Sequence, residues 1–163
     1  MERTPARTVG AVLFALGLAE PLLFQVRNHP NQIVYFSPLM GGPGAAFARY
    51  DMDYWGNSVL QAVQWADTVA RDAGIPLVVS GNPIQVVDAD AGRYRSLMVV
   101  ERRNLAYHFD IRLMRGPADS LREFAARPDI LHKVTTADGT PLCVVIPGPR
   151  YQAVADKLRV HTH

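Results

Sequence analysis

Apolar residues are distributed unevenly along the chain, and the longest apolar run lies near its start. Residues Thr8 to Val26 form a nineteen-residue segment that only Glu20, Pro21 and Gln25 interrupt. As a helix at about 1.5 Å per residue, this segment would reach about 28 Å, close to the hydrocarbon thickness of a bilayer. The pattern therefore predicts a single transmembrane helix.

Basic residues flank this segment on both sides. Arg3 and Arg7 precede it and Arg27 follows it. Positively charged flanks tend to stay in the cytoplasm, so the first two favour a cytoplasmic N-terminus and an exported remainder, although Arg27 weakens the bias.

A cleavable signal peptide is the main alternative for this segment. In that interpretation Val9 to Leu18 is the apolar region and Gly17 to Ala19 is a small-x-small cleavage site. A buried soluble helix is disfavoured, because a helix that is apolar on all sides needs protein around it, which a small domain hardly supplies. We expect a retained span and leave the question of cleavage open.

From Asn57 onward the pattern changes to that of a soluble domain. Apolar residues recur at three- and four-residue steps from Val59 to Ala73, between a cap at Asn57 or Ser58 and a stop at Gly74. This spacing predicts an amphipathic helix. The short apolar run that follows, Pro76 to Ser80, is typical of a buried strand.

The remaining elements are shorter. Residues 84 to 115 are the hardest to assign, but strands are expected at Leu97–Val100, Tyr107–Leu113, Ile130–Thr135 and Pro141–Ile146. Asp138-Gly139 is a hairpin signal between the last two strands. Helices are expected at Pro117–Ala126 and Tyr151–Leu158.

This alternation predicts an α/β fold: one N-terminal transmembrane helix followed by a small extracytoplasmic domain with a mixed or mostly parallel sheet. We divide the chain into three parts. Residues 1–28 are the tail and transmembrane helix, residues 29–57 are a joint, and residues 58–163 are the exported α/β domain.

The joint concentrates aromatic residues among prolines and glycines, a mixture that suits neither a regular helix nor a regular strand. Tyr and Trp favour the boundary between membrane and water, because their rings are apolar while their OH and NH groups need partners. The aromatics therefore indicate an interfacial layer, a cap on the core of the domain, or both. They are Tyr35, Phe36, Phe47, Tyr50, Tyr54 and Trp55.

Composition and charge narrow the possible partners. The formal net charge is +2 and the arginines are scattered, which argues against nucleic-acid binding. Cys143 is the single cysteine, so no intrachain disulfide can form, and its apolar surroundings indicate a buried, inert thiol. We expect no cofactor and no metal.

Two motifs carry a resemblance. The run HPNQIVYFSPLMGG from His29 to Gly42 and the run YDMDYWG from Tyr50 to Gly56 follow an apolar span and precede a helix and a VVSGNP strand. This arrangement resembles the last transmembrane helix and C-terminal exported α/β domain of bacterial GT-C type membrane glycosyltransferases. Their first motif has Asn at the position of Ser37. The resemblance covers nearly the whole chain but only the tail of that family.

The resemblance implies a bacterial inner-membrane location with the main domain in the periplasm. In that family the catalytic carboxylates lie in an early exported loop of the transmembrane bundle, and nothing before Thr8 supplies such a loop.

The most suggestive chemical pattern is the D-x-D formed by Asp51 and Asp53. Such pairs hold divalent cations in some sugar transferases. The resemblance places this pair away from the family's active site, so we expect it to cap the following helix or to pair with Arg49. Ser80 and Asn82, at the end of a predicted strand, are weaker candidates for ligand contacts.

Glu20, His29 and the terminal pair His161 and His163 complete the candidates. Glu20 lies in the last third of the apolar run, so it is either an interfacial carboxyl or a contact to a polar group on a neighbouring transmembrane helix. His29 at the membrane edge is expected to be solvated, and the terminal pair indicates at most adventitious metal binding.

Two functional hypotheses follow. The first is a non-catalytic single-span protein whose exported domain is an accessory or structural subunit of a larger membrane complex, with other transmembrane subunits and the bilayer as partners. The second is a truncated or split C-terminal part of a GT-C glycosyltransferase that uses a lipid-linked sugar donor. In both, the expected interface residues are Glu20, His29, Tyr35, Phe36, Tyr50, Tyr54 and Trp55.

Overall fold

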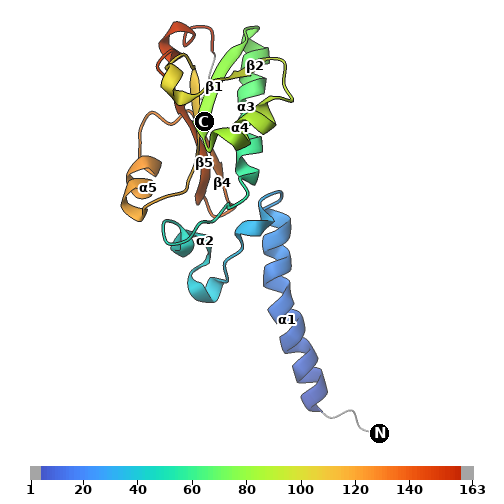
Figure 1. Ribbon diagram of the computed structural model, residues 1–163. Helices are drawn as coiled ribbons and strands as arrows, with labels where there is room; N and C mark the ends of the chain where they lie inside the picture. The colour runs from blue at the N-terminus through green and yellow to red at the C-terminus, as the bar shows by residue number, and fades with distance from the viewer. Residues whose placement is uncertain (1–4, 159–163) are drawn as a thin grey trace.

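The computed structural model describes residues 5–158, which form one long helix attached to an α/β domain (Figure 1). Helix α1 (Pro5–Arg27) projects from one end of the domain, and its membrane-length segment is not buried against the rest of the chain. By length and apolar composition this helix can cross a membrane. The predicted long apolar helix is therefore confirmed.

Five strands form one mixed sheet in the order β2-β1-β3-β5-β4. β1 runs parallel to β2 and to β3, whereas β5 runs antiparallel to β3 and to β4. The mixed α/β sheet expected from the sequence is thus confirmed. The strands are β1 (Leu77–Asn82), β2 (Leu97–Val99), β3 (Phe109–Leu113), β4 (His132–Thr135) and β5 (Pro141–Pro147).

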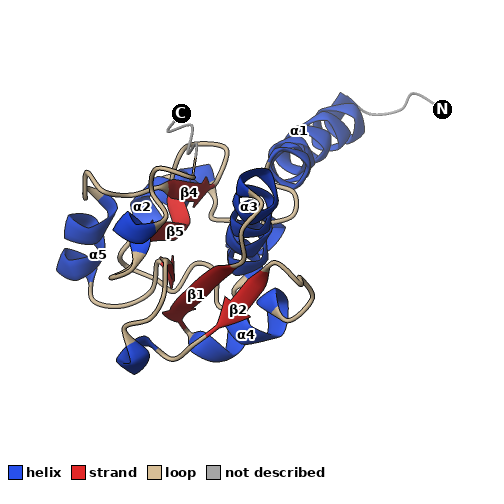
Figure 2. Cartoon of the chain, turned by 90° about the horizontal axis from the view of Figure 1, so that it is seen from above, coloured by secondary structure: helices blue, strands red, loops and turns tan. Residues whose placement is uncertain are grey.

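Helices cover both faces of the sheet (Figure 2). On one face, α3 (Asn57–Ala73) and α4 (Ile84–Ala91) pack against alternate strand residues such as Phe109 and Ile111, both fully buried. On the other face, α5 (Ala118–Ala125) packs Leu121 against Val144 and Ile146 of β5. The strand expected at Tyr107–Leu113 and the helix expected at Pro117–Ala126 are therefore both present, as β3 and α5.

Short helical turns build the joint between α1 and α3. They are η1 (Gln32–Val34), η2 (Pro38–Met40) and α2 (Gly42–Ala46). Two further turns lie in the domain, η3 (Arg102–Asn104) and η4 (Tyr151–Ala153). The joint therefore contains no long regular element, as its proline and glycine content indicated.

Two sequence assignments need correction. Helix α4 was not predicted, because its eight residues follow Pro83 and are too few for a clear helical period. The closing helix predicted at Tyr151–Leu158 is wrong: only η4 is helical, and most backbone hydrogen bonds after it join residues three apart. Tyr151, Val154 and Leu158 pack on the main core without forming an α-helix.

Candidate functional site

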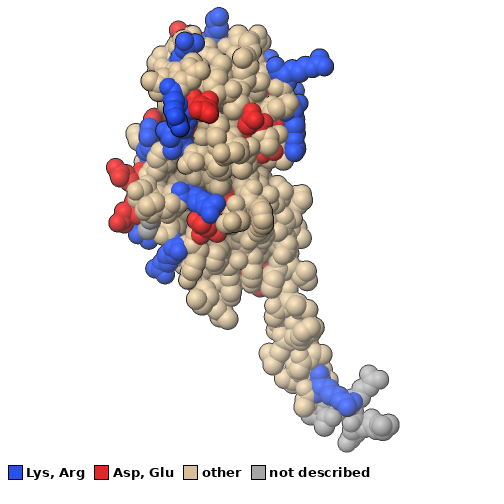
Figure 3. Space-filling model, in the orientation of Figure 1, with Lys and Arg blue, Asp and Glu red and all other residues tan. Residues whose placement is uncertain are grey.

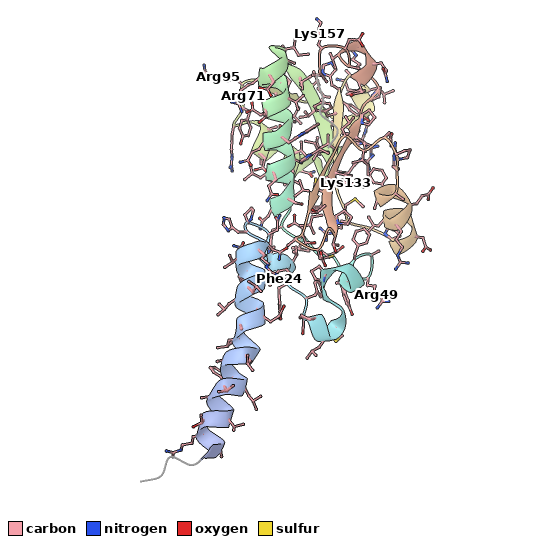
Figure 4. The ribbon with its side chains drawn as sticks, turned by 180° about the vertical axis from the view of Figure 1, so that it is seen from behind. Phe24, Arg49, Arg71, Arg95, Lys133 and Lys157 are labelled. Atoms are coloured by element: carbon pink, nitrogen blue, oxygen red, sulfur yellow. The ribbon has the colours of Figure 1, made fainter. Side chains whose placement is uncertain are left out.

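The last turns of α1 are fixed to the domain by apolar packing. The Phe24 ring meets the Tyr35 ring edge-to-face, with centroids 5.1 Å apart. Phe24 also packs on a buried cluster formed by Val34, Ala46, Met52 and Leu142. Figure 4 shows Phe24 where α1 meets the domain. The cluster joins α1, the joint and β5, so the helix is attached through side chains as well as through the chain itself.

Glu20 has a hydrogen-bond partner inside the chain. The Tyr35 hydroxyl donates to Glu20 Oε2 at 2.7 Å, and this bond raises the pKa of Tyr35. The two expected environments for Glu20 were water at the interface and a polar group on a neighbouring helix. Tyr35, fifteen residues along the chain, is a partner that neither expectation included.

Asn28 is a site residue that the sequence did not reveal. Its side chain is 6% exposed and connects two elements. The amide NH₂ donates to the Phe24 carbonyl at 3.0 Å, and Oδ1 accepts from the Ala137 N–H at 2.8 Å. Ala137 lies in the turn between β4 and β5, so Asn28 ties the end of α1 to a segment more than one hundred residues away. No local pattern distinguishes such an asparagine from a simple helix terminator.

The aromatic residues of the joint divide into an inner and an outer group. Phe36 is partly buried and stacks on Tyr50 with ring centroids 5.6 Å apart. Tyr50, Tyr54 and Trp55 are 59%, 56% and 70% exposed. Phe36 therefore packs on a core cluster, as one of the two interpretations expected. The outer three rings are exposed, and their position at a membrane interface stays a prediction.

The two carboxylates of the D-x-D point to different partners. Asp53 is 5% exposed; its oxygens accept from the N–H groups of Asn57 and Ser58 and from the Ser58 hydroxyl. It thus satisfies the first turn of α3, whose N-cap is Gly56 and not Asn57 or Ser58.

Asp51, in contrast, is exposed and pairs with Arg115 at 3.0 Å, not with Arg49 as expected. The Arg115 guanidinium also lies over the Tyr54 ring, 4.8 Å from its centroid. Each carboxylate of the D-x-D therefore has its own structural partner.

His29 is exposed and lies beside Gln32, whose Nε2 is 2.6 Å from His29 Nδ1. Donation by the amide to Nδ1 leaves the ring proton on Nε2. The ring therefore makes a local contact within the first turn of the joint. His161 and His163 lie outside the described residues.

Ser80 and Asn82 do not form a common site. Ser80 is fully buried in β1, whereas Asn82 is exposed at the carboxyl end of the same strand. Asn82 borders a polar hollow of about 460 Å³ together with Arg102 and Arg103. Ser80 Oγ and the neighbouring Asp110 Oδ1 have no hydrogen-bond partner among the described residues.

Comparison with known proteins adds no relative. The chain matches no protein-family model, no curated protein and no solved structure. None of these comparisons bears on the expected resemblance to GT-C glycosyltransferases, which stays a prediction.

Metal and thiol chemistry find little support in the described part of the chain. Residues 5–158 contain no group of three or more His, Cys, Asp or Glu side chains arranged to hold a metal ion. Cys143 is fully buried in β5, and burial raises the pKa of its thiol far above the ordinary value. This agrees with the expectation of an inert cysteine.

A groove of about 630 Å³ starts at Trp55 and runs between α3 and α4. Its wall carries the amide side chains of Gln61, Gln64 and Gln85, and Asp90 and Arg93 lie along it. The Gln61 Nε2 and the Oδ1 of buried Asn31 beside it have no partner among the described residues. Trp55 thus borders a concave surface that combines apolar side chains, such as Leu60 and Val86, with these polar groups.

Proposed function

We propose that this chain is a non-catalytic membrane protein in which α1 crosses a bacterial inner membrane once, with its N-terminus in the cytoplasm. The periplasmic α/β domain then serves as an accessory or structural subunit of a larger membrane complex. One observation carries the proposal: no residue in the membrane-length window of α1 is buried, yet Phe24, Asn28 and the Glu20–Tyr35 hydrogen bond fix its last turns to the domain.

A bare apolar helix needs lipid or other helices around it, because its side chains have no shelter within the chain. If α1 only anchored the chain to the membrane, the domain would need no side-chain contacts with α1. The side-chain connections instead make α1 and the domain one unit, so the orientation of the domain follows the orientation of the helix. A structural subunit benefits from such coupling because its domain must meet a partner at a fixed angle.

The outer aromatic rings suit contact with a protein partner. Trp and Tyr are enriched among the residues that contribute most to protein interfaces. Trp55 and Tyr54 meet edge-to-face with centroids 5.2 Å apart, and both remain more than half exposed. Together with the adjoining groove they form the surface on which we expect a neighbouring subunit to dock.

A second candidate is the C-terminal part of a GT-C glycosyltransferase that acts with a separate or missing transmembrane bundle. It is favoured by the placement of the motif residues. Tyr35 and Phe36 of the first motif, and Asp53 and Trp55 of the second, all lie at the joint, either holding it together or facing outward from it. Residues that connect a last transmembrane helix to an exported domain would have this structural role in a glycosyltransferase as well as in a single-span subunit.

The test is purification from native membranes in mild detergent. We expect the chain to migrate in a complex, and Trp55→Ala to release it, whereas Met98→Ala should not, because Met98 is similarly exposed (59%) but lies on β2. A chain that migrates alone under every mild condition would contradict the subunit proposal. A many-span partner with paired exported carboxylates would favour the glycosyltransferase.

A further inference from the structure

The most exposed large apolar side chain in the described structure belongs to Leu39, at 97%, and its neighbour Met40 is 73% exposed. Both lie on η2, and we call these two residues the apolar tip. Adjacent apolar side chains held almost entirely in water are unfavourable unless something covers them.

The apolar tip is held by a built turn. Ser37 Oγ accepts from the Leu39 N–H at 3.3 Å, and the N–H groups of Gly41 and Gly42 donate to the carbonyls of Pro38 and Ser37. Gly41 has a φ of +88°, and a Cβ there would lie 2.5 Å from Ala45 Cβ. The turn therefore requires glycine, and it fixes the two side chains outward.

The position of the tip relates it to α1. Figures 1 and 4 show the loop that carries η2 and α2 hanging from the domain beside the domain-proximal part of α1, on the side toward which α1 projects. Residues 30–48 contain no Asp, Glu, Lys or Arg. In Figure 3 the protruding lower end of the domain beside α1 is drawn mostly as uncharged surface. Charged residues, among them Glu20, Arg27 and Asp138, line the hollow between α1 and this end of the domain.

A charged residue directly follows this uncharged segment. Arg49 follows the uncharged segment and is exposed, and Figure 4 shows it at the domain end of the loop. Arg71, Arg95 and Lys157 lie at the opposite end of the domain. This order matches a membrane interface. The apolar tip would lie at the acyl chains, Arg49 at the headgroups, and the polar body of the domain in water.

We propose that the apolar tip inserts into the interfacial region of the same bilayer that α1 crosses, as a second membrane contact of the domain. This inference rests on the proposed crossing by α1. Lipid is the occupant because the tip protrudes on the side of the domain from which α1 projects (Figure 1) and its loop, residues 30–48, carries no charged side chain. Two contacts on one rigid unit fix the rotation of the domain about α1, which a single span leaves free.

The experiment places a fluorescent reporter at the tip. The full chain carrying Met40→Cys is labelled with an environment-sensitive fluorophore and reconstituted into phosphatidylcholine vesicles containing a minority of phosphatidylglycerol. Cys143 does not interfere, because it is fully buried. Met98→Cys is the matched control, being an exposed methionine on β2. Leu13→Cys, in the middle of α1, reports whether the helix is in lipid.

We expect the Met40 reporter to be blue-shifted, quenched by shallow nitroxide lipids and protected from aqueous iodide, with the Met98 reporter showing the opposite. A Met40 reporter that behaves like the Met98 reporter, while the Leu13 reporter is in lipid, overturns the inference and leaves the proposed span intact. A Met40 reporter protected from both quenchers also overturns it, because protein then covers the tip. A Leu13 reporter in water overturns the span itself and the inference with it.

Discussion

Asp53 and Asp51, two residues apart, are expected to respond very differently to truncation. Asp53→Ala removes a buried carboxylate that accepts three hydrogen bonds and leaves the α3 amides without partners. We expect a loss of about 1–3 kcal/mol in the free energy of unfolding. Asp51→Ala removes an exposed ion pair with Arg115 and should cost about 0–1 kcal/mol. Urea unfolding of the full chain in detergent, followed by tryptophan fluorescence, measures both.

This pair of variants also tests the metal hypothesis for the D-x-D. If Asp51 and Asp53 held one divalent cation together, that metal would stabilise the parent chain against unfolding. It would stabilise neither variant. Equal losses for the two variants, with such a metal dependence in the parent chain, would contradict the structural roles assigned here.

His132 makes the stability of the domain dependent on pH. Its ring stacks on Trp65 with centroids 4.8 Å apart, and burial lowers the pKa of His132 below its ordinary value near 6.5. The unfolded chain therefore binds a proton more readily than the folded chain, so the stabilising contribution is complete above the unfolded pKa and is lost as pH falls toward and below the folded pKa.

His108 acts in the same direction. Burial and the nearby Arg150 lower its pKa, and its Nδ1 accepts a hydrogen bond from the Val78 N–H, which only the uncharged nitrogen can do. We expect the urea midpoint to fall between about pH 7 and about pH 5. His132→Gln should make that fall smaller. A midpoint that is unchanged over this range, or a variant with the same pH dependence as the parent chain, would contradict this explanation.

At the scale of elements, the contact between α1 and the domain depends on Asn28. Asn28→Ala leaves the Ala137 N–H without its acceptor and removes the connection to the β4–β5 turn. We expect a loss of about 1–3 kcal/mol in unfolding free energy and much faster hydrogen exchange at Ala137. Asn104→Ala, at an exposed position in η3, is the control and should change neither quantity. Unchanged exchange at Ala137 would show that the tie is not maintained in solution.

Local patterns predicted most of the elements. The three- and four-residue spacing from Val59 to Ala73 predicted α3, and the strand expected at Tyr107–Leu113 corresponds to β3. Both elements bury an apolar face in the main core. Helix α4 escaped prediction because eight residues after a proline show too little periodicity. The helix predicted at Tyr151–Leu158 was wrong because the apolar residues there have helical spacing, whereas the backbone forms a short 3-10 helix followed by turns.

The partners within the candidate site could not be predicted in the same way. Glu20 and Tyr35, Asp51 and Arg115, and Asn28 and Ala137 meet across fifteen, sixty-four and one hundred and nine residues. Composition indicated that each polar group needed a partner, but only the packing of α1, the joint and the β4–β5 turn decides which one. Trp55 illustrates the same limit, since nothing local indicates that it is 70% exposed.

At the scale of the whole molecule, exposed apolar surface is concentrated at one end. Most exposed large apolar side chains belong to α1, the apolar tip and the outer aromatic rings, while Met98 and Leu105 are exposed elsewhere on the domain. Figure 4 shows Arg71 and Lys157 at the far end of the domain. A protein surrounded by water on all sides gains no stability from apolar surface that is gathered at one end. In the proposed arrangement lipid covers α1 and the apolar tip, and a partner subunit covers the outer aromatic rings.

The most direct test of the central claim is sided cysteine labelling in bacterial spheroplasts with a membrane-impermeant maleimide. The parent chain provides the blank, because Cys143 is fully buried. The proposal predicts that Met98→Cys is labelled in intact spheroplasts, and that Ala6→Cys, exposed at the start of α1, is labelled only after permeabilisation. Labelling of Ala6→Cys from outside, or of Met98→Cys only after permeabilisation, would contradict the proposed crossing and the periplasmic domain.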